Sequence, residues 1–439
     1  MTDGQESLAE LEALSRQVAK AILEHDIVRL ISHNDADGLS AAGIMCNALH
    51  RKGILFHATI VSQFDQSTLE LIEKTSIGPV ILCDMGSGQV ELASRIKEAI
   101  IIDHHKPTGK LEHVHFNPHL VGIDGSIELC ASCGAYMVAR QMGENTDLAG
   151  LAIAGATGDK QPMKGANKFI LDEAINNKIV TSSKGLRMGD GPLEEIFENS
   201  VDPYLDITGD KDKIRTFLDN LGIKGELRNL SEEQLTKLSS VIILKLVKQG
   251  GFPAIKSLIG DNYRLDREVV QNIYDFVNIL NACGKDEKAG IALSLCMRDA
   301  SFIDEAKAIA RENQRALISV IKKAQAQIKL ARSFRYVLLE DSSGTGIIAG
   351  TMTRYLYPDK PFLTLNEVEG KIRVSGRGTR ELVGAGLDLA AAMREASAIV
   401  GGMGGGHDVA SGATISVGTA MKFIDLLDSI IEKQLKPKA

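Results

Sequence analysis

The chain has 439 residues, of which 24% are charged and 44% hydrophobic, and its formal net charge at pH 7 is −7. This size predicts two or three domains, and the composition is that of an ordinary globular protein. The acidic balance and the 4% of aromatic residues, with no tryptophan, argue against a protein that coats nucleic acid or stacks many bases. A local basic groove beside an acidic metal site stays compatible with these numbers.

Two further features bear on the location of the protein. No apolar run is long enough to span a bilayer, and the acidic, helical start is unlike a signal peptide, so we expect a cytoplasmic protein without membrane contact. Six scattered cysteines predict reduced thiols. Cys130 and Cys133 form a CxxC without a second pair, which indicates two buried thiols rather than a metal or redox site.

The first third of the chain alternates strand-like and helix-like segments. Strands that are apolar on both faces, each followed by a helix, are typical of a parallel α/β sheet. The expected strands are residues 27–32, 55–61, 78–84 and 99–105. The expected helices are residues 7–24, 38–53, 67–75, 90–98, 127–143 and 147–156.

The rest of the chain changes character twice. Residues 165–300 read as mostly helical with little strand signal, and residues 301–333 as one long helix whose apolar residues recur at three- and four-residue steps. A second α/β unit begins at residue 334, and within it residues 401–412 read as a glycine-rich loop.

We therefore predict an α/β protein in four parts. A parallel-sheet domain and a smaller α/β domain are joined by the long helix, and a mostly helical insertion lies between them. The expected bounds are 1–164 for the first domain, 165–300 for the insertion, 301–333 for the connecting helix and 334–439 for the second domain.

Acidic and histidine side chains follow the expected strands of the first domain. In an open parallel sheet, ligand sites gather at the carboxyl ends of the strands. Several carboxylates in one cleft repel each other unless cations lie between them. Carboxylate and imidazole ligands without a thiolate favour Mn²⁺ or Mg²⁺ over structural zinc. The segments are SHNDADG (His33, Asp35, Asp37), ILCDMGSG (Asp84), IIDHHKP (Asp103, His104, His105) and GATGDK (Asp159).

The spacing within these segments suggests how two ions are held. Asp35 and Asp37 are two residues apart, so they share a side if the backbone stays extended, and one carboxylate can face each ion. Asp84 is placed to bridge the ions. Two ions about 3.5–4 Å apart can activate a water and stabilise charge on a phosphoryl group.

Taken together, the four segments resemble the four motifs of the DHH phosphoesterase superfamily. The stretch GGMGGGHDVASGATI, residues 401–415, resembles the glycine-rich motif of its DHHA1 companion domain. The likeness covers about residues 25–165 and 334–435, and TSSKGLRMGDGPLEEIF in the middle resembles archaeal RecJ-like proteins.

The resemblance implies a set of site residues. Two Mn²⁺ ions, with Mg²⁺ as the alternative, would be held by His33, Asp35, Asp37, Asp84, His104 and Asp159; all of these but His33 form the expected catalytic set. This chain departs from the bacterial RecJ pattern at His33, where bacterial RecJ has a carboxylate. Asp103 would orient His104 from outside the ligand set, and His105 would contact a substrate phosphate.

The second domain would supply substrate contacts. The glycines Gly404, Gly405 and Gly406 offer bare backbone N–H groups to a phosphate, with His407 beside them. Arg377 could grip the same phosphate with two hydrogen bonds.

The function that the resemblance implies is that of a RecJ-like exonuclease in DNA replication or repair. It would hydrolyse single-stranded DNA or RNA to nucleoside monophosphates. Three alternatives stay open: a phosphodiesterase of short oligonucleotides or cyclic dinucleotides, a replication scaffold that binds a GINS-type partner, and a manganese inorganic pyrophosphatase. The glycine-rich motif counts against the last, and GINS-type binding is compatible with activity. The sequence leaves the polarity and the oligomeric state open, a homo-oligomer included.

Overall fold

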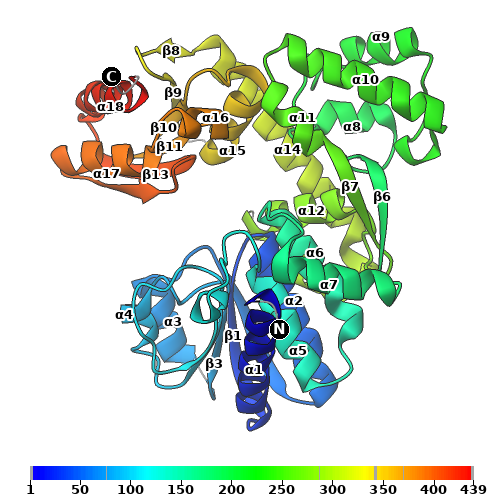
Figure 1. Ribbon diagram of the computed structural model, residues 1–439, viewed down its shortest axis with the longest axis vertical. Helices are drawn as coiled ribbons and strands as arrows, with labels where there is room; N and C mark the ends of the chain where they lie inside the picture. The colour runs from blue at the N-terminus through cyan, green and yellow to red at the C-terminus, as the bar shows by residue number, and fades with distance from the viewer. Residues whose placement is uncertain (1–2, 76, 286, 341–343, 369, 437–439) are drawn as a thin grey trace. The chain divides into compact units, whose positions relative to one another are not determined.

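The computed structural model describes residues 3–75, 77–285, 287–340, 344–368 and 370–436 (Figure 1). The chain divides into two compact units, Met1–Lys184 with Asp261–Ala310, and Gly185–Gly260 with Arg311–Ala439. Each unit is made of two separate stretches of the chain, whereas the four parts expected from the sequence are consecutive stretches. The bounds of those four parts stay a prediction. None of the helices in the described residues combines the length and the hydrophobicity that a membrane span requires.

A five-stranded parallel sheet forms the centre of the first unit, as the sequence predicts. Its order is β2-β1-β3-β4-β5. The chain leaves β1 on one side to form β2 and then crosses to β3 on the other side, so the crevice between the ends of β1 and β3 is the expected ligand site. The strands are β1 (Ile27–His33), β2 (Leu55–Val61), β3 (Val80–Cys83), β4 (Ala99–Ile102) and β5 (Val114–Phe116).

Helices cover both faces of this sheet (Figure 1). Side chains alternate across a strand, so Leu30 and Cys83 enter a large core while their neighbours Ile31 and Leu82 enter a smaller one. The large core includes residues of α1 (Asp3–Leu23), α2 (Ala36–Lys52), α5 (Ala131–Met142), α6 (Ala149–Gly158) and α7 (Gly165–Asn176). The smaller core includes residues of α3 (Gln66–Thr75) and α4 (Val90–Ala93). The helix expected over 90–98 ends already at Ala93.

Part of the expected insertion belongs to the first unit. Its helices α12 (Ile273–Lys285) and α13 (Ala289–Cys296) bury Ile273, Phe276 and Leu295 in the large core. The segment also contains two strands that its helical pattern did not indicate, β6 (Val180–Leu186) and β7 (Ile259–Leu265), which pair as a two-stranded sheet.

The second unit contains a six-stranded mixed sheet of order β12-β13-β11-β10-β9-β8. The strands are β8 (Lys329–Leu330), β9 (Arg335–Glu340), β10 (Phe362–Val368), β11 (Lys371–Arg377), β12 (Met403–Gly406) and β13 (Ala410–Ser416). The helices are α8 (Leu193–Asn199), α9 (Lys211–Leu221), α10 (Glu232–Lys248), α11 (Ile255–Leu258), α15 (Thr345–Thr351), α16 (Arg380–Gly384), α17 (Leu389–Ile399) and α18 (Ala420–Leu435).

Two expectations for this part of the chain were wrong. The long helix α14 (Ile303–Ala326) ends before residue 333, because the chain turns into β8 and pairs with β9. The glycine-rich stretch is not a loop: residues 403–406 form β12, an edge strand paired with β13. A Cβ at Gly404 would lie 2.6 Å from the carbonyl oxygen of Met393, so the glycine lets the strand pack closely on α17.

Candidate metal centre

The first motif lies at the junction of β1 and α2. His33 is the last residue of β1, and Asp35 is the N-cap of α2, where its Oδ1 accepts a hydrogen bond from the Gly38 N–H at 3.0 Å. Asp37 already lies in the first turn of the helix. The two carboxylates are therefore separated by a helix start rather than by the extended backbone that the spacing suggested.

The carboxylate of Asp37 is fully buried and held by the start of α5. Its Oδ2 accepts from the Ala131 N–H at 2.8 Å and its Oδ1 from the Ser132 N–H at 2.9 Å. These are N–H groups of a first helical turn, which lack partners within their own helix and favour a negative charge. Asp37 is thus fixed by a segment almost a hundred residues away.

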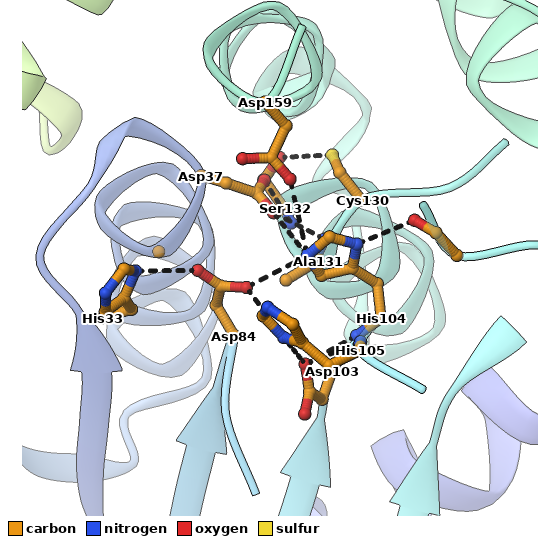
Figure 2. Close-up of polar contacts among 12 residues, drawn as sticks. His33, Asp37, Asp84, Asp103, His104, His105, Cys130, Ala131, Ser132 and Asp159 are labelled. Carbon is orange, nitrogen blue, oxygen red and sulfur yellow. Dashed lines mark hydrogen bonds and ion pairs between the residues drawn. The ribbon is translucent and has the colours of Figure 1, made fainter. Parts of the chain in front are cut away.

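Asp84 lies between two histidines (Figure 2). It follows β3 directly, with its Oδ2 3.3 Å from His33 Nδ1 and its Oδ1 3.2 Å from His104 Nε2. Among the described residues, Asp84 Oδ1 is a buried oxygen that makes no hydrogen bond of normal geometry, although His104 Nε2 lies beside it. A buried carboxylate oxygen without a hydrogen bond is costly, and a cation beside it would remove that cost.

His104 turns its Nε2 toward the acidic cluster. Besides Asp84, this nitrogen lies 3.4 Å from Asp159 Oδ2 and 3.8 Å from Asp37 Oδ2. The other ring nitrogen, Nδ1, lies 2.8 Å from the carbonyl oxygen of Gly125, which orients the ring when that nitrogen donates. Asp159 follows α6, so this carboxylate is placed by a helix end and not by the strand end that the sequence suggested.

Asp103 does not orient the ring of His104 as expected. Its Oδ1 accepts from the backbone N–H of His104 at 2.7 Å and lies 2.8 Å from His105 Nδ1. The ring held by this carboxylate is therefore that of His105, because the His104 ring contacts Gly125 instead.

The side chains form three overlapping groups in which one ligand atom per residue lies within 4.8 Å of the others. Asp84 belongs to two of the groups and His104 to two. The groups are His33–Asp35–Asp84, Asp37–His104–Asp159 and Asp84–His104–His105. The structure thus brings together all six residues expected as ligands, and it adds His105, which was expected only as a substrate contact.

The electrostatics of the cluster favour cations. Burial raises the pKa of Asp37 and of Asp159, and the neighbouring carboxylates raise both further. Burial lowers the pKa of His33, but Asp35 and Asp84 outweigh it and raise the value to about 11. Burial likewise opposes a charged His104, yet its acidic neighbours raise the pKa well above normal. Without cations, bound protons reduce the repulsion between the carboxylates. Divalent cations would reduce it in their place, and oxygen and imidazole donors are suitable ligands for such cations.

The candidate substrate contacts of the second unit lie in its sheet. Arg377 ends β11 half-buried, and its Nη1 donates to the carbonyl oxygen of Gly376 at 2.9 Å. Burial lowers the pKa of Arg377, and no carboxylate of the described residues lies within 4 Å of its guanidinium. His407 is exposed directly after β12. In the described part of the chain, Arg377 is thus a cation without an acidic partner.

Sequence reasoning missed the support that α12 gives to the first motif. The Asn281 Oδ1 accepts from the Ala36 N–H, and the Asn34 Nδ2 donates to the Gly284 carbonyl oxygen, both at 3.1 Å. A Cβ at Gly284 would overlap the backbone oxygen of Asn34 and lie 2.9 Å from its carbon. The only sequence signal was a glycine inside a helical pattern, because about 250 residues separate the partners.

Comparison with known proteins identifies a known domain in each half of the chain. Residues 27–156 match the family model of the DHH family, N-terminal domain, and residues 340–433 match that of the DHHA1 domain. The uncharacterized protein MJ0831 of Methanocaldococcus jannaschii is 34% identical over 446 residues, which cover 98% of this chain and 99% of the relative.

Solved structures with a similar fold include RecJ and CDC45. RecJ from Thermus thermophilus in complex with Mn²⁺ has a TM-score of 0.61 at 16% identity, with 96% of this chain and 55% of RecJ covered, so the chain spans about half of that protein. CDC45 from Entamoeba histolytica has a TM-score of 0.61 at 15% identity, with 98% and 99% covered. At such identities the likeness shows the fold alone. With both domain models matched and a relative aligned along its whole length, this chain belongs to the DHH–DHHA1 superfamily and has the RecJ-like fold.

Proposed function

We propose that the protein is a metal-dependent phosphodiesterase that hydrolyses single-stranded DNA or RNA from a chain end and releases nucleoside monophosphates, in DNA replication or repair. The observation that carries the proposal is the convergence of carboxylates and imidazoles around Asp84. A structure described as exonuclease RecJ bound to manganese covers 96% of this chain at a TM-score of 0.58 and supports this choice of reaction.

We assign the metal ligands to two positions that share Asp84. His33 and Asp35 complete one position, and Asp37, His104 and Asp159 complete the other. Mn²⁺ is the proposed cation, and Mg²⁺ is the second choice because its preference for oxygen ligands suits the imidazoles less well. Bound there, the cations would lower the pKa of a water and stabilise charge on the phosphoryl group.

Other residues of the site hold the proposed ligands in position. The N–H groups of Ala131 and Ser132 keep Asp37 in place, and the carbonyl oxygen of Gly125 keeps the His104 ring in place. The His105 side chain is 55% exposed and is held by Asp103, so it can donate to a phosphate oxygen at the rim of the cluster.

In the second unit, we propose that Arg377, the glycines of β12 and His407 bind the phosphate of a chain end. The support is a half-buried guanidinium that has no acidic partner among the described residues, and an edge strand whose Gly405 leaves open space for a ligand. The main-chain groups on the free edge of such a strand can bind an anion, and the guanidinium can bind it with two hydrogen bonds.

End-labelled ladders of single-stranded DNA and RNA, incubated with Mn²⁺, test the proposal. We expect labelled mononucleotide from one end only, and no product from Asp84→Asn. Asp172→Asn on the exposed face of α7 is the matched control and should behave as wild type. Absence of product from every ladder, or equal cleavage by Asp84→Asn, would contradict the proposal.

Two other candidate functions can be distinguished from an exonuclease with the same oligonucleotides and the Asp84→Asn variant. A phosphodiesterase of short oligonucleotides or cyclic dinucleotides would show turnover that falls as the chain lengthens. The likeness to CDC45 favours a scaffold. In that case wild type and Asp84→Asn would bind a GINS-type partner equally well in a pull-down, and neither protein would hydrolyse nucleic acid. The complete ligand set argues for an enzyme.

A further inference from the structure

Two buried amide side chains, Gln161 and Asn167, form a chain of hydrogen bonds that reaches His104. They are 7% and 0% exposed. Gln161 Nε2 donates to the carbonyl oxygen of Gly125 at 2.8 Å, and Gln161 Oε1 accepts from Asn167 Nδ2 at 2.8 Å. The carbonyl oxygen of Gly125 is also the one that contacts His104 Nδ1. A single oxygen thus joins the imidazole to the pair of amides.

The orientation of the Gln161 amide follows from these contacts. An amide oxygen 2.8 Å from a carbonyl oxygen would be repelled, so the atom that faces Gly125 must be Nε2. Oε1 then faces Asn167, which must present its Nδ2. For the same reason His104 Nδ1 must carry a hydrogen toward Gly125, and it lies 3.4 Å from Gln161 Nε2, a second donor to that oxygen. The other ring nitrogen, Nε2, is left for a cation.

Gln161 is also attached to the segment that carries Asp159. It follows this residue by two positions, and its N–H donates to the carbonyl oxygen of Ala156 in α6 at 2.9 Å. Asn167, its side-chain partner, lies in the first turn of α7. The Gln161 side chain therefore connects the end of α6 to the oxygen that holds the imidazole.

Close packing leaves the shared oxygen little freedom. A Cβ at Gly125 would overlap the carbonyl oxygen of His104 and lie 3.0 Å from its carbonyl carbon. Ordinary carbon contacts are about 3.5–4.0 Å, so glycine is what lets the two backbone segments lie this close. Any change in the direction of the Gly125 carbonyl would turn the imidazole with it.

The amide pair is an expensive way to fill the core. Burying an amide costs free energy unless its hydrogen bonds are made, and among the described residues Asn167 Oδ1 makes none. Two apolar side chains could occupy the same space without that cost. The pair therefore points to a role other than packing.

We propose that Gln161 is a positioning residue that holds His104 and Asp159 together as ligands of one metal position. The proposal rests on the metal positions of the proposed function and adds a residue beyond the matched DHH segment. Gln161 acts through the Gly125 oxygen that orients the imidazole and through the segment that carries Asp159. Removal of a partner of this kind typically weakens metal binding by about 10–100-fold. In the described part of the chain, the amide pair has no hydrogen bond to His33 or Asp35 of the other position.

The competing explanation is that the amide pair only stabilises the fold around α6 and α7. Asn145→Ala is the matched control, since Asn145 is a buried amide of the same unit whose Nδ2 donates to the carbonyl oxygen of Ala139 at 2.8 Å. It lies beyond the C-terminal end of α5, whereas Asp37 is held at the opposite end of that helix. Changes at Asn145 and at Gln161 should both lower the melting temperature, but only the change at Gln161 should affect the metal centre.

Anomalous diffraction from crystals of wild type, Gln161→Met and Asn145→Ala tests the proposal, at the MnCl₂ concentration that half-fills the wild-type positions. Methionine has nearly the length of glutamine and no amide. In Gln161→Met, the peak beside His104 and Asp159 should fall about fivefold or more relative to the peak beside His33 and Asp35. Calorimetry in solution should show one Mn²⁺ binding event weakened by about tenfold or more. Asn145→Ala should keep the wild-type ratio of peaks and the wild-type affinities.

Asn167→Ala is a second variant, in which Gln161 stays in place but loses the donor to its Oε1. It should reduce the same peak by a smaller factor, and it decides the question if Gln161→Met does not fold. An unchanged ratio of peaks, equal weakening of both peaks, or the same change in Asn145→Ala would overturn the proposal.

Failure of the proposed function gives a different result, because these measurements need no substrate. If wild type binds Mn²⁺ at both positions but hydrolyses no oligonucleotide, a changed ratio of peaks in Gln161→Met keeps this inference while the exonuclease assignment falls. If wild type binds no Mn²⁺ beside His104, both are wrong.

Discussion

The replacement of Gly155 by alanine is the sharpest test of how the centre is built. Gly155 lies in α6, and a Cβ there would overlap Ser132 Oγ and Asp37 Oδ1 and lie 2.7 Å from Ser132 Cβ. Ordinary carbon contacts are about 3.5–4.0 Å, so the groups must separate by about 1 Å. Asp37 and Ser132 are both fully buried and cannot move aside freely.

Either way of relieving the overlap disturbs the cluster. If α6 moves away, it takes Asp159 with it; if Asp37 moves, it leaves the N–H groups of α5. We expect a loss of about 1–3 kcal/mol in the free energy of unfolding and a loss of about 10²-fold in turnover, since displacements near 1 Å have that effect on catalysis.

Mn²⁺ titration calorimetry, turnover and urea unfolding of Gly155→Ala provide the measurements. Gly290→Ala is the control, because a Cβ there meets nothing within 4 Å and alanine is the better helix former. If Gly155→Ala binds Mn²⁺ and turns over substrate like wild type, the close packing of α6 on Asp37 does not position the metal ligands, and this reasoning is refuted.

Three further predictions concern charge and metal. Asp84→Asn should lower Mn²⁺ affinity about 100-fold or more in calorimetry while circular dichroism stays unchanged; retained affinity would be evidence against a shared ligand. Arg298→Ala leaves the buried Glu268 unpaired and should cost about 3 kcal/mol of unfolding free energy at pH 7. Arg298 also pairs with Asp147. Burial raises the pKa of Asp147, but Arg51 and Arg298 lower it to about 2, so the part of the stabilisation that comes from the Arg298–Asp147 pair is complete above about pH 4 and is lost as the pH falls toward 2. Urea unfolding at several pH values should show the difference from wild type shrinking in that range, and a constant difference would contradict it. Mn²⁺ at 100 times its Kd should stabilise the fold by about 2.7 kcal/mol, seen as a higher melting temperature that EDTA reverses; an unchanged melting temperature would mean that the cation does not bind the folded state.

The sequence predicted those parts of the fold that depend on local pattern. Strands such as residues 27–32 and 99–105 are apolar on both faces, and the parallel sheet they indicate was confirmed. The four acidic segments were expected to meet because the carboxyl ends of parallel strands share one edge. Their convergence in space agrees with that expectation, whereas their roles as ligands stay a prediction.

What the sequence did not predict depends on contacts between distant segments. Nothing local to Asp37 indicates that α5 holds it, and nothing near Gly284 indicates the loop it packs against. The glycines of β12 read as a loop because glycine is rare in strands, while close packing on α17 is what requires Gly404. Long-range packing overrode local preference in each case.

The proposed function requires that the cluster around Asp84 binds a pair of divalent cations. Diffraction from crystals soaked in MnCl₂, recorded at the manganese absorption edge, would locate them directly. We expect two anomalous peaks that share Asp84, one contacted by His33 and Asp35 and the other by Asp37, His104 and Asp159. Crystals with no peak at Asp84, while manganese binds elsewhere on the protein, would contradict it.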